Sequence, residues 1–190
     1  MPDSDATWLA GLKRGDRAAF DAVYERYRPG LFSFLARMTG RREVAEDLLQ
    51  ETWLRLARHA PTLADDTDVG GWLFTVATNA VRSHHRWQVV DLARVRNALF
   101  APLVAPQVSA FEALAATQAE QALERGLAAL SNSDREVLLL VGVEGLAPAQ
   151  AANVLGLRPE ALRQRLSRAR TRLAAQLGET ELISALGGLP

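Results

Sequence analysis

The segment RQRLSRARTR, residues 163–172, holds five arginines in ten residues of a chain whose formal net charge is zero. Guanidinium groups carry forked donors that match phosphate and carboxylate oxygens, so this segment has the chemistry to bind an anionic partner. Most charge runs, however, are only the solvated face of a surface helix. The residues around the segment have to decide between binding and mere exposure.

The neutral net charge hides a strong local asymmetry. Residues 158–172 contain six arginines and one acid, a net charge of +5. Residues 112–157 contain six acids and two arginines, a net charge of −4. The number of arginines is weak evidence for a function. Lys13 is the one lysine among 22 basic residues, and a GC-rich genome also produces such a preference for arginine over lysine. Their placement is the informative observation.

The sequence APAQAANVLGLRPEALRQRLSRAR, residues 147–170, has the spacing of a helix-turn-helix. Pro148 and Pro159 each suit the first turn of a helix, and Gly156 lies where a tight turn needs a positive φ. Ala151 and Ala152 are small enough to let two helices cross closely. A generic helical hairpin packed in a bundle shares this pattern, so the spacing alone leaves DNA binding and plain packing both open.

The second of these helices sorts its side chains by type at about 100° per residue. One apolar stripe consists of Leu162, Leu166, Ala169 and Leu173, and the opposite polar face consists of Gln164, Ser167, Arg168 and Thr171. Arginines flank the polar face, Arg163 and Arg170 on one side and Arg165 and Arg172 on the other. A helix in the DNA major groove needs short polar groups toward the bases and cations toward the phosphates. A solvated helix would pair Glu with Arg, yet residues 161–178 contain no acid.

Helical periodicity dominates the whole chain and predicts an all-α fold. The expected helices of the first block run from Asp16 to Gly40 with a bend or break at Pro29, from Glu43 to Arg58, and from Trp72 to about Trp87. In the second block, one helix is expected from about Phe111 to Leu130, and another begins at a capping box formed by Ser133 and Glu136. Two more are expected from Pro148 to Leu155 and from Pro159 to about Leu177. We therefore expect two small helical domains, residues 1–88 and 112–190, joined by a linker over 89–111.

Three further motifs accompany the arginine-rich helix: DLLQETWLRL at 47–56, WLFTVATNAVRSHHR at 72–86 and LSNSDREVLLL at 130–140. Each motif alone is moderate evidence, whereas their order and spacing together are specific. With them the chain resembles the two-domain, extracytoplasmic-function (ECF) sigma factors of bacterial RNA polymerase. The resemblance covers about residues 20–87 and 114–177.

The resemblance implies a polymerase-binding helix at 47–56. It assigns contacts with the clamp helices of the largest polymerase subunit to Asp47, Gln50 and Glu51, beside which the expected polymerase-binding surface also includes Leu54. The flap of the second-largest subunit is a further expected partner. These four residues lie within two turns on adjoining helix faces, which suits a basic partner. Without the resemblance, an exposed acidic helix would be the preferred interpretation.

The resemblance also implies two DNA-binding helices. Residues expected at the minus-ten element are Trp72, Asn79, Arg82 and Arg86, the last three spaced to share one helix face. Trp72, Phe74 and Trp87 have rings that can stack on unpaired bases, although Trp72 and Phe74 suit the core at least as well. Residues expected at the minus-thirty-five element are Arg163, Gln164, Arg165, Ser167, Arg168, Arg170 and Arg172. The loop 62–71 lies where the family captures an extruded base.

The chain departs from the family pattern at several positions. Ser83 stands where an acidic residue is common, and Thr75 stands where a basic residue is frequent. Glu160 and Ala161 replace a common Gly-Thr pair. These differences affect the inferred promoter sequence more than the inferred fold.

The sequence offers little for catalysis or metal binding. It has no cysteine, which removes disulfides, thiolate nucleophiles and cysteine-based zinc sites. His84 and His85 are adjacent and so face different sides of a helix. We expect no enzymatic activity, no cofactor and no metal. No apolar run reaches the ~18 residues of a membrane span, and the acidic start MPDSDATWLA is unlike a signal peptide, so we expect a cytoplasmic protein without a membrane partner.

The sequence therefore predicts a sigma factor that directs core polymerase to promoters and opens the minus-ten region, with an anti-sigma protein as a further implied partner. One alternative is a sigma-like mimic that binds an anti-sigma protein without driving transcription. The arginines of both DNA-facing helices argue against a mimic, which needs neither. A second alternative is a stand-alone helix-turn-helix repressor, which would leave the motif at 47–56 without a role and would normally be a dimer.

Overall fold

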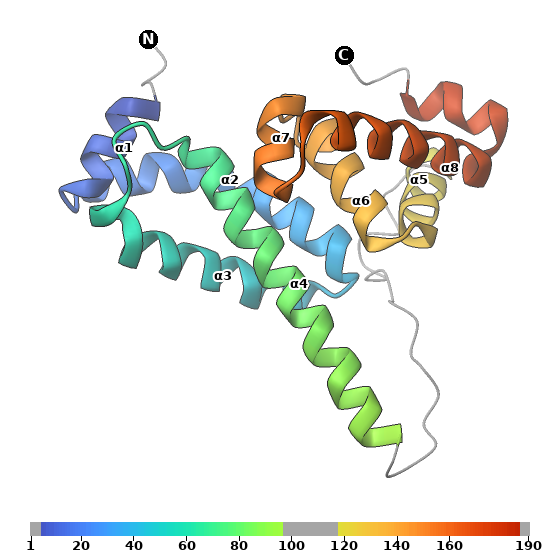
Figure 1. Ribbon diagram of the computed structural model, residues 1–190, viewed down its shortest axis with the longest axis horizontal. Helices are drawn as coiled ribbons and strands as arrows, with labels where there is room; N and C mark the ends of the chain where they lie inside the picture. The colour runs from blue at the N-terminus through green and yellow to red at the C-terminus, as the bar shows by residue number, and fades with distance from the viewer. Residues whose placement is uncertain (1–4, 97–117, 187–190) are drawn as a thin grey trace. The chain divides into compact units, whose positions relative to one another are not determined.

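The computed structural model describes residues 5–96 and 118–186 and is helical through most of both ranges (Figure 1). The first range contains α1 (Asp5–Lys13), α2 (Arg17–Thr39), α3 (Arg42–His59), the short 3-10 turn η1 (Ala60–Thr62) and α4 (Val69–Arg96). The second contains α5 (Gln118–Ala129), α6 (Asn132–Leu138), the π-helical turn η2 (Leu139–Val143), α7 (Pro148–Leu155) and α8 (Pro159–Leu186). Two compact units result, one centred on α1–α4 and the other on α5–α8. The predicted all-α fold is confirmed.

Helix α1 corrects the expectation that the first helix begins near Asp16. It has only nine residues, so its apolar pattern covers few turns and gives a weak periodic signal, yet Leu9 and Leu12 are both buried. Gly11 permits a close approach to α2, because a Cβ atom at this position would collide with Ala19. Asp16 itself does cap the next helix, since its carboxylate accepts the backbone N–H of Ala18 at 2.9 Å.

Helix α2 contains Pro29 but is not divided by it. The helix ends as predicted at Gly40, whose φ of 65° is in the left-handed region. The N–H of Gly40 donates to the carbonyl of Ala36 at 2.8 Å, which satisfies a carbonyl at the end of the helix.

Helix α4 is longer than expected at both ends. It begins at Val69 rather than Trp72 because the carboxylate of Asp68 accepts the N–H of Gly71 at 3.0 Å and caps the first turn. It continues past Trp87 to Arg96, so the first part of the predicted linker over 89–111 is helical. The rest of that linker, and the expected helix start near Phe111, lie outside the described residues.

The start of α6 also differs from the prediction. Its N-cap is Ser131, whose hydroxyl accepts the N–H of Asp134 at 3.2 Å, and not Ser133. Ser133 lies inside the first turn, and Glu136 is buried within the helix. The sequence contains two serines two residues apart, and the spacing to Glu136 favoured the wrong one.

The helix-turn-helix has the predicted local geometry. Pro148 and Pro159 begin α7 and α8, and Gly156 ends α7 with a φ of 66°. Leu157 then donates its N–H to the carbonyl of Ala152 at 2.9 Å, which closes the turn. Ala151 and Ala152 are both buried, as a close helix crossing requires. The predicted end of α8 near Leu177 coincides with a break at Gly178, whose φ and ψ are 72° and 159°.

Candidate functional site

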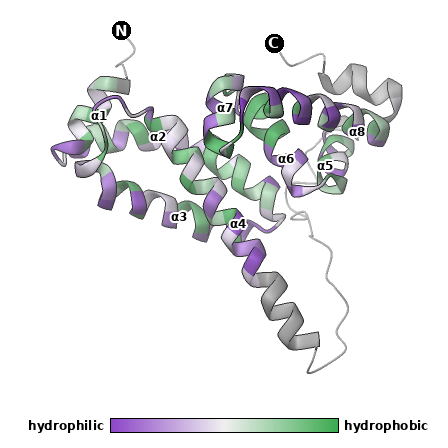
Figure 2. Cartoon of the chain, viewed as in Figure 1, coloured by the Kyte–Doolittle hydropathy of each residue, from purple (hydrophilic) through white to green (hydrophobic). Residues whose placement is uncertain are grey.

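The faces of α8 are those predicted from the sequence. The apolar stripe is buried, with exposed fractions of 0% for Leu162, 8% for Leu166, 0% for Ala169 and 5% for Leu173. The opposite face, which we name the polar strip, is exposed and consists of Gln164, Ser167, Arg168 and Thr171. Figure 2 shows hydrophilic and hydrophobic residues alternating along α8 and α3, as amphipathic helices require. No large apolar side chain is exposed on the described part of α8.

The flanking arginines of α8 differ in their surroundings. Arg163 and Arg170 are exposed and Arg165 is half-buried. Arg163 pairs with Glu160 one turn earlier at 3.2 Å, but both side chains are more than two-thirds exposed (68% and 69%). An exposed pair of this kind is worth at most ~1 kcal/mol, so Arg163 can exchange Glu160 for another anion at little cost.

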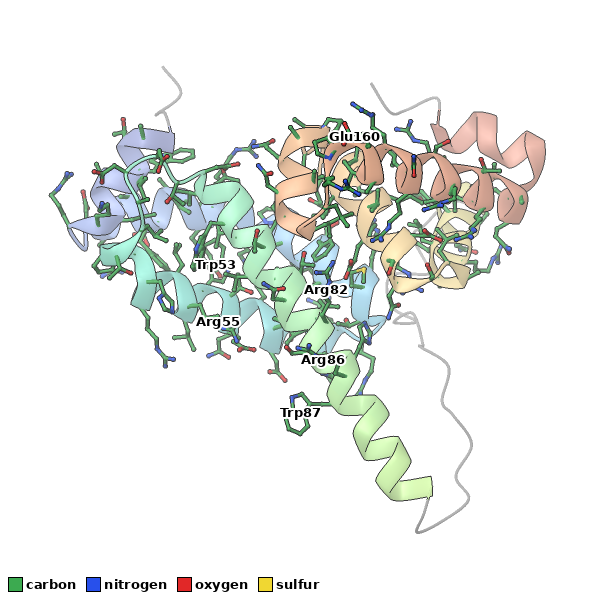
Figure 3. All side chains as sticks on the ribbon, viewed as in Figure 1. Trp53, Arg55, Arg82, Arg86, Trp87 and Glu160 are labelled. Carbon is green, nitrogen blue, oxygen red and sulfur yellow. The ribbon has the colours of Figure 1, made fainter. Side chains whose placement is uncertain are left out.

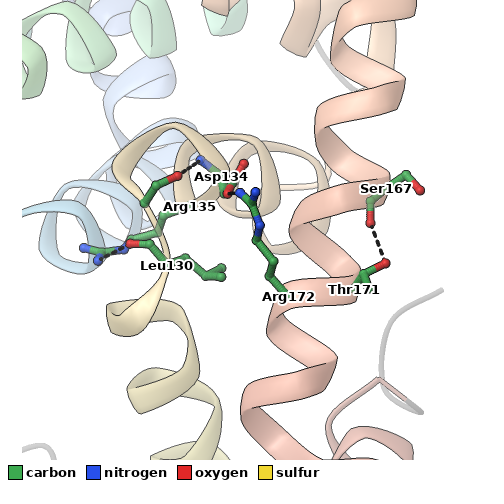
Figure 4. Close-up of polar contacts among 7 residues, drawn as sticks. Leu130, Asp134, Arg135, Ser167, Thr171 and Arg172 are labelled. Carbon is green, nitrogen blue, oxygen red and sulfur yellow. Dashed lines mark hydrogen bonds and ion pairs between the residues drawn. The ribbon is translucent and has the colours of Figure 1, made fainter.

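Arg172 has a different partner. Its guanidinium forms an ion pair with the carboxylate of Asp134 on α6 (Figure 4). The Asp134 side chain is 6% exposed, whereas that of Arg172 is 59% exposed. Arg172 is among the residues expected from the sequence to contact DNA, and its pair with Asp134 is not predicted there. No local signal could have revealed it, because the two residues are 38 positions apart.

Arg135 is a structural residue that the sequence analysis missed. It is buried, and its guanidinium donates to the carbonyls of Leu127 at 2.8 Å, Ala128 at 2.6 Å and Leu130 at 3.2 Å. These carbonyls belong to the end of α5, where backbone acceptors lack helical partners. Burial lowers the pKa of Arg135, while the nearby Glu124 raises it. A lone cation in the run DREVLLL was the available sequence signal.

Helix α3 presents the predicted polymerase-binding residues. Asp47 and Gln50 are exposed, and Leu54 is 49% exposed although it is apolar. Glu51 is half-buried and pairs with Arg55 one turn later at 2.5 Å. The opposite side of the helix is buried and includes Leu48, Leu49, Thr52, Trp53 and Leu56. The four predicted residues therefore do lie together on the outer side of α3.

Trp53 anchors α3 to α2 through an aromatic cluster. Its ring centroid lies 5.9 Å from that of Phe20 and 4.8 Å from that of Tyr24. The guanidinium of Arg28 lies 5.8 Å from the centre of the Tyr24 ring, within range of a cation–π contact. The cluster fixes the helix whose outer face carries Leu54.

Helix α4 carries a polar face of the predicted spacing. Asn79 and Arg86 are exposed, Arg82 is half-buried, and Arg86 donates to the hydroxyl of Ser83 at 3.0 Å. Figure 3 shows Arg82, Arg86 and Trp87 following one another along this helix. Trp87 is 65% exposed, which leaves most of its ring open to a partner.

The other two aromatic residues of α4 divide between core and surface. Phe74 is 5% exposed and meets Phe34 edge-on, with ring centroids 6.0 Å apart, so it belongs to the core. Trp72 is half-buried, and its ring centroid lies 6.4 Å from that of His59. Of the three rings proposed for stacking, Phe74 is therefore unavailable and Trp87 is the most accessible.

The loop between η1 and α4 uses two of its three aspartates within the first unit. Asp68 caps α4, as described above, and Asp65 forms an ion pair with Lys13 of α1. The hydrogen bond and charge of Lys13 hold the pKa of Asp65 below its ordinary value. Asp66 is exposed. Helix α1, which the sequence analysis missed, thus contacts the loop expected to capture a base.

Within residues 5–96 and 118–186, no group of three or more His, Asp or Glu side chains is placed to hold a metal ion. None of the helices described there is long and apolar enough to span a membrane.

Comparison with known proteins identifies both units. Residues 23–89 match the family model of Sigma-70 region 2, and residues 120–173 match that of Sigma-70, region 4. The ECF RNA polymerase sigma factor SigM of Mycobacterium tuberculosis is 34% identical over 92% of this chain and 85% of its own length. The sigma factor CarQ of Myxococcus xanthus is 33% identical over 90% of this chain and 96% of its own.

Two solved structures have the same fold. The sigma factor RpoE of Bartonella quintana, crystallised with the anti-sigma factor NepR, aligns with a TM-score of 0.69 and 25% identity over 83% of this chain and 96% of its own. CnrH, in complex with the cytosolic domain of CnrY, aligns with a TM-score of 0.69 and 24% identity over 92% of this chain and 97% of its own. The matched regions, in this order and over most of the chain, show that the protein belongs to the ECF sigma factors, which direct RNA polymerase to promoters.

Proposed function

We propose that α8 enters the DNA major groove at the minus-thirty-five element. The observation that carries this proposal is the exposed polar strip of α8, flanked by arginines and free of acids and large apolar side chains. Gln164, Ser167 and Arg168 face the base edges, where an amide and a guanidinium can each form two hydrogen bonds. Arg163, Arg165 and Arg170 lie toward the phosphates and supply affinity with little sequence preference.

The minus-ten element is contacted by α4 in this proposal. Asn79, Arg82 and Arg86 share one side of the helix, so an amide is placed for a base and two cations for the backbone. Trp87, exposed beside Arg86, offers a stacking surface for an unpaired base. Trp72 is half-buried, so only the accessible part of its ring can contact a base.

Core polymerase binds the outer side of α3 through Asp47, Gln50, Glu51 and Leu54. An apolar side chain among acidic and amide groups is typical of a protein interface, where an apolar contact supplies affinity and charges supply orientation. The clamp helices of the largest subunit are the proposed partner of this surface, and the flap of the second-largest subunit is that of the α5–α8 unit.

An anti-sigma protein is a further proposed partner, because the related RpoE was crystallised with one. The protein acts in the cytoplasm with polymerase and catalyses no reaction of its own. The sigma factor assignment stands against the two alternatives weighed from the sequence, a sigma-like mimic and a stand-alone repressor. The exposed cations of α4 and α8 favour a DNA-binding protein over a mimic, and the surface of α3 favours a polymerase subunit over a repressor.

Run-off transcription tests these functions together. Core polymerase from the native host is mixed with the chain and with promoter fragments that the resulting holoenzyme selects from a randomised pool. A sigma factor gives a transcript of fixed start site that depends on the chain. A mimic binds core polymerase or an anti-sigma protein and gives no transcript, whereas a repressor binds DNA without core polymerase.

A further inference from the structure

The ion pair between Asp134 and Arg172 is unlike the other pairs of α8. In the pair of Glu160 and Arg163, both partners are exposed and both can find water. In the pair of Asp134 and Arg172, the carboxylate is 6% exposed and has lost most of its water, while the guanidinium still reaches the surface. A buried charge without its partner is strongly unfavourable, so Asp134 holds Arg172 far more firmly than Glu160 holds Arg163.

The position of Asp134 is itself fixed by its neighbours. Ser131 caps the first turn of α6 through the N–H of Asp134 (Figure 4). The next residue, Arg135, ties the same turn to three carbonyls at the end of α5. The first turn of α6, which carries Asp134, is therefore held by its own cap and by its hydrogen bonds to the end of α5.

The ion pair adds a directional contact to the packing of α8. The buried stripe of Leu166, Ala169 and Leu173 packs through apolar contacts, which are non-directional. Arg172 lies one turn after Arg168, on the same length of helix as the polar strip. An ion pair with a fixed carboxylate here limits rotation of α8 and so sets the direction in which Gln164 and Arg168 point.

We propose that Asp134 and Arg172 are positioning residues that fix the orientation of α8, and that Arg172 does not contact DNA phosphate. The proposal rests on the proposed role of α8 at the minus-thirty-five element. It removes Arg172 from the flanking arginines that contact phosphate and leaves Arg163, Arg165 and Arg170. It also assigns a role in promoter recognition to α6, a helix to which the proposed function gives no base contact.

The test measures promoter binding by holoenzyme made from the full chain and core polymerase. The probe is a selected promoter fragment, together with copies that carry one changed base pair in the minus-thirty-five element, and binding is titrated over a range of salt concentrations. The variants are Asp134→Asn, Arg172→Gln, the double variant, and the matched control Arg170→Gln on the same helix. Thermal unfolding of each free variant accompanies the binding data.

We expect Asp134→Asn and Arg172→Gln each to weaken binding by about tenfold and to reduce the preference for the correct base pair. The double variant should lose no more than either single variant, because both remove one contact. The salt slope should stay that of the wild type for Arg172→Gln and fall by about 0.9 for Arg170→Gln, as the loss of one phosphate contact predicts.

Opposite results would overturn the proposal. If Arg172 contacts phosphate, Arg172→Gln lowers the salt slope as Arg170→Gln does, and Asp134→Asn strengthens binding because it frees a cation. Should Arg172→Gln fail to fold because it leaves the buried carboxylate of Asp134 without its partner, Asp134→Asn decides alone, since it removes that charge, and stronger binding by Asp134→Asn overturns the proposal. If none of the four variants, Arg170→Gln included, affects binding, the proposed DNA-binding role of α8 has failed instead.

Discussion

Helices α3 and α8 are alike in their buried faces and differ in the side chains that they expose. Each buries an apolar stripe and carries an intrahelical ion pair between exposed or half-exposed partners. On α3 the exposed side combines Asp47 and Gln50 with the apolar Leu54, whereas on α8 it combines short polar groups with arginines. Protein surfaces and nucleic acids demand these two different compositions, because the first offers apolar contact area and the second a regular array of phosphates.

The comparison can first be tested with two leucines of α3 that are two positions apart. Leu56 is fully buried and Leu54 is 49% exposed. We expect Leu56→Ala to lower the free energy of unfolding by ~2–5 kcal/mol, as for other core leucines, while Leu54→Ala changes it little. Leu54→Ala should instead weaken core polymerase binding by ~1–3 kcal/mol. Chemical denaturation and polymerase titration separate the two effects, and equal affinities of wild type and Leu54→Ala would exclude Leu54 from the interface.

A second test concerns the polar strip of α8. Gln164→Ala and Arg168→Ala should each change which base is preferred at one position, at ~1–3 kcal/mol for a lost bidentate contact. Stability should stay near that of the wild type because both side chains are exposed. Promoter selection by the variant holoenzymes measures the preference. A uniform loss over all sequences would mean that these residues contact the backbone rather than bases.

The third test compares the salt dependence of the two surfaces. Arg165→Ala should weaken all promoters alike and reduce the salt slope of DNA binding by about 0.9, since it removes one phosphate contact. Leu54→Ala should leave the salt slope of DNA binding by the assembled holoenzyme unchanged. Fluorescence anisotropy at several salt concentrations provides both values. If Arg165→Ala instead changed the preferred base at one position, Arg165 would contact a base and not a phosphate.

The smallest expected effect involves the pair of Lys13 and Asp65. Because its pKa is lowered in the folded protein, Asp65 stabilises the fold above its ordinary pKa of 3.8, and this contribution is lost as the pH falls through the folded value. Titration of the carboxyl resonance by NMR should show the lowered pKa in the wild type and an ordinary one in Lys13→Ala. An unchanged titration in Lys13→Ala would assign the shift to another cause.

The elements best predicted from the sequence were those with strong local signals. The turn at Gly156 and the starts at Pro148 and Pro159 depend on backbone chemistry that single residues determine, and the stripe of α8 depends on a regular period. Helix α1 lacks such a period and is held by contacts with α2, so no comparable local signal marks it.

The candidate site divides in the same way. Exposure of Gln164 and Arg168 follows from helix geometry alone, whereas the pairing of Arg172 with Asp134 depends on how α6 meets α8. For Phe74 the sequence left stacking and core packing both open, and its contact with Phe34 decides for the core. Residues whose roles are set by distant partners were the ones that the sequence could not assign.

The separation of faces on α8 has a consequence for how such proteins diversify. The residues that contact bases in the proposed complex are exposed and make no contribution to the buried stripe. Substitutions at Gln164 or Ser167 can therefore change the preferred promoter while the helix keeps its place. A duplicated gene could acquire a new set of target promoters through a few such changes, and an engineer could build mutually independent transcription circuits on one unchanged scaffold.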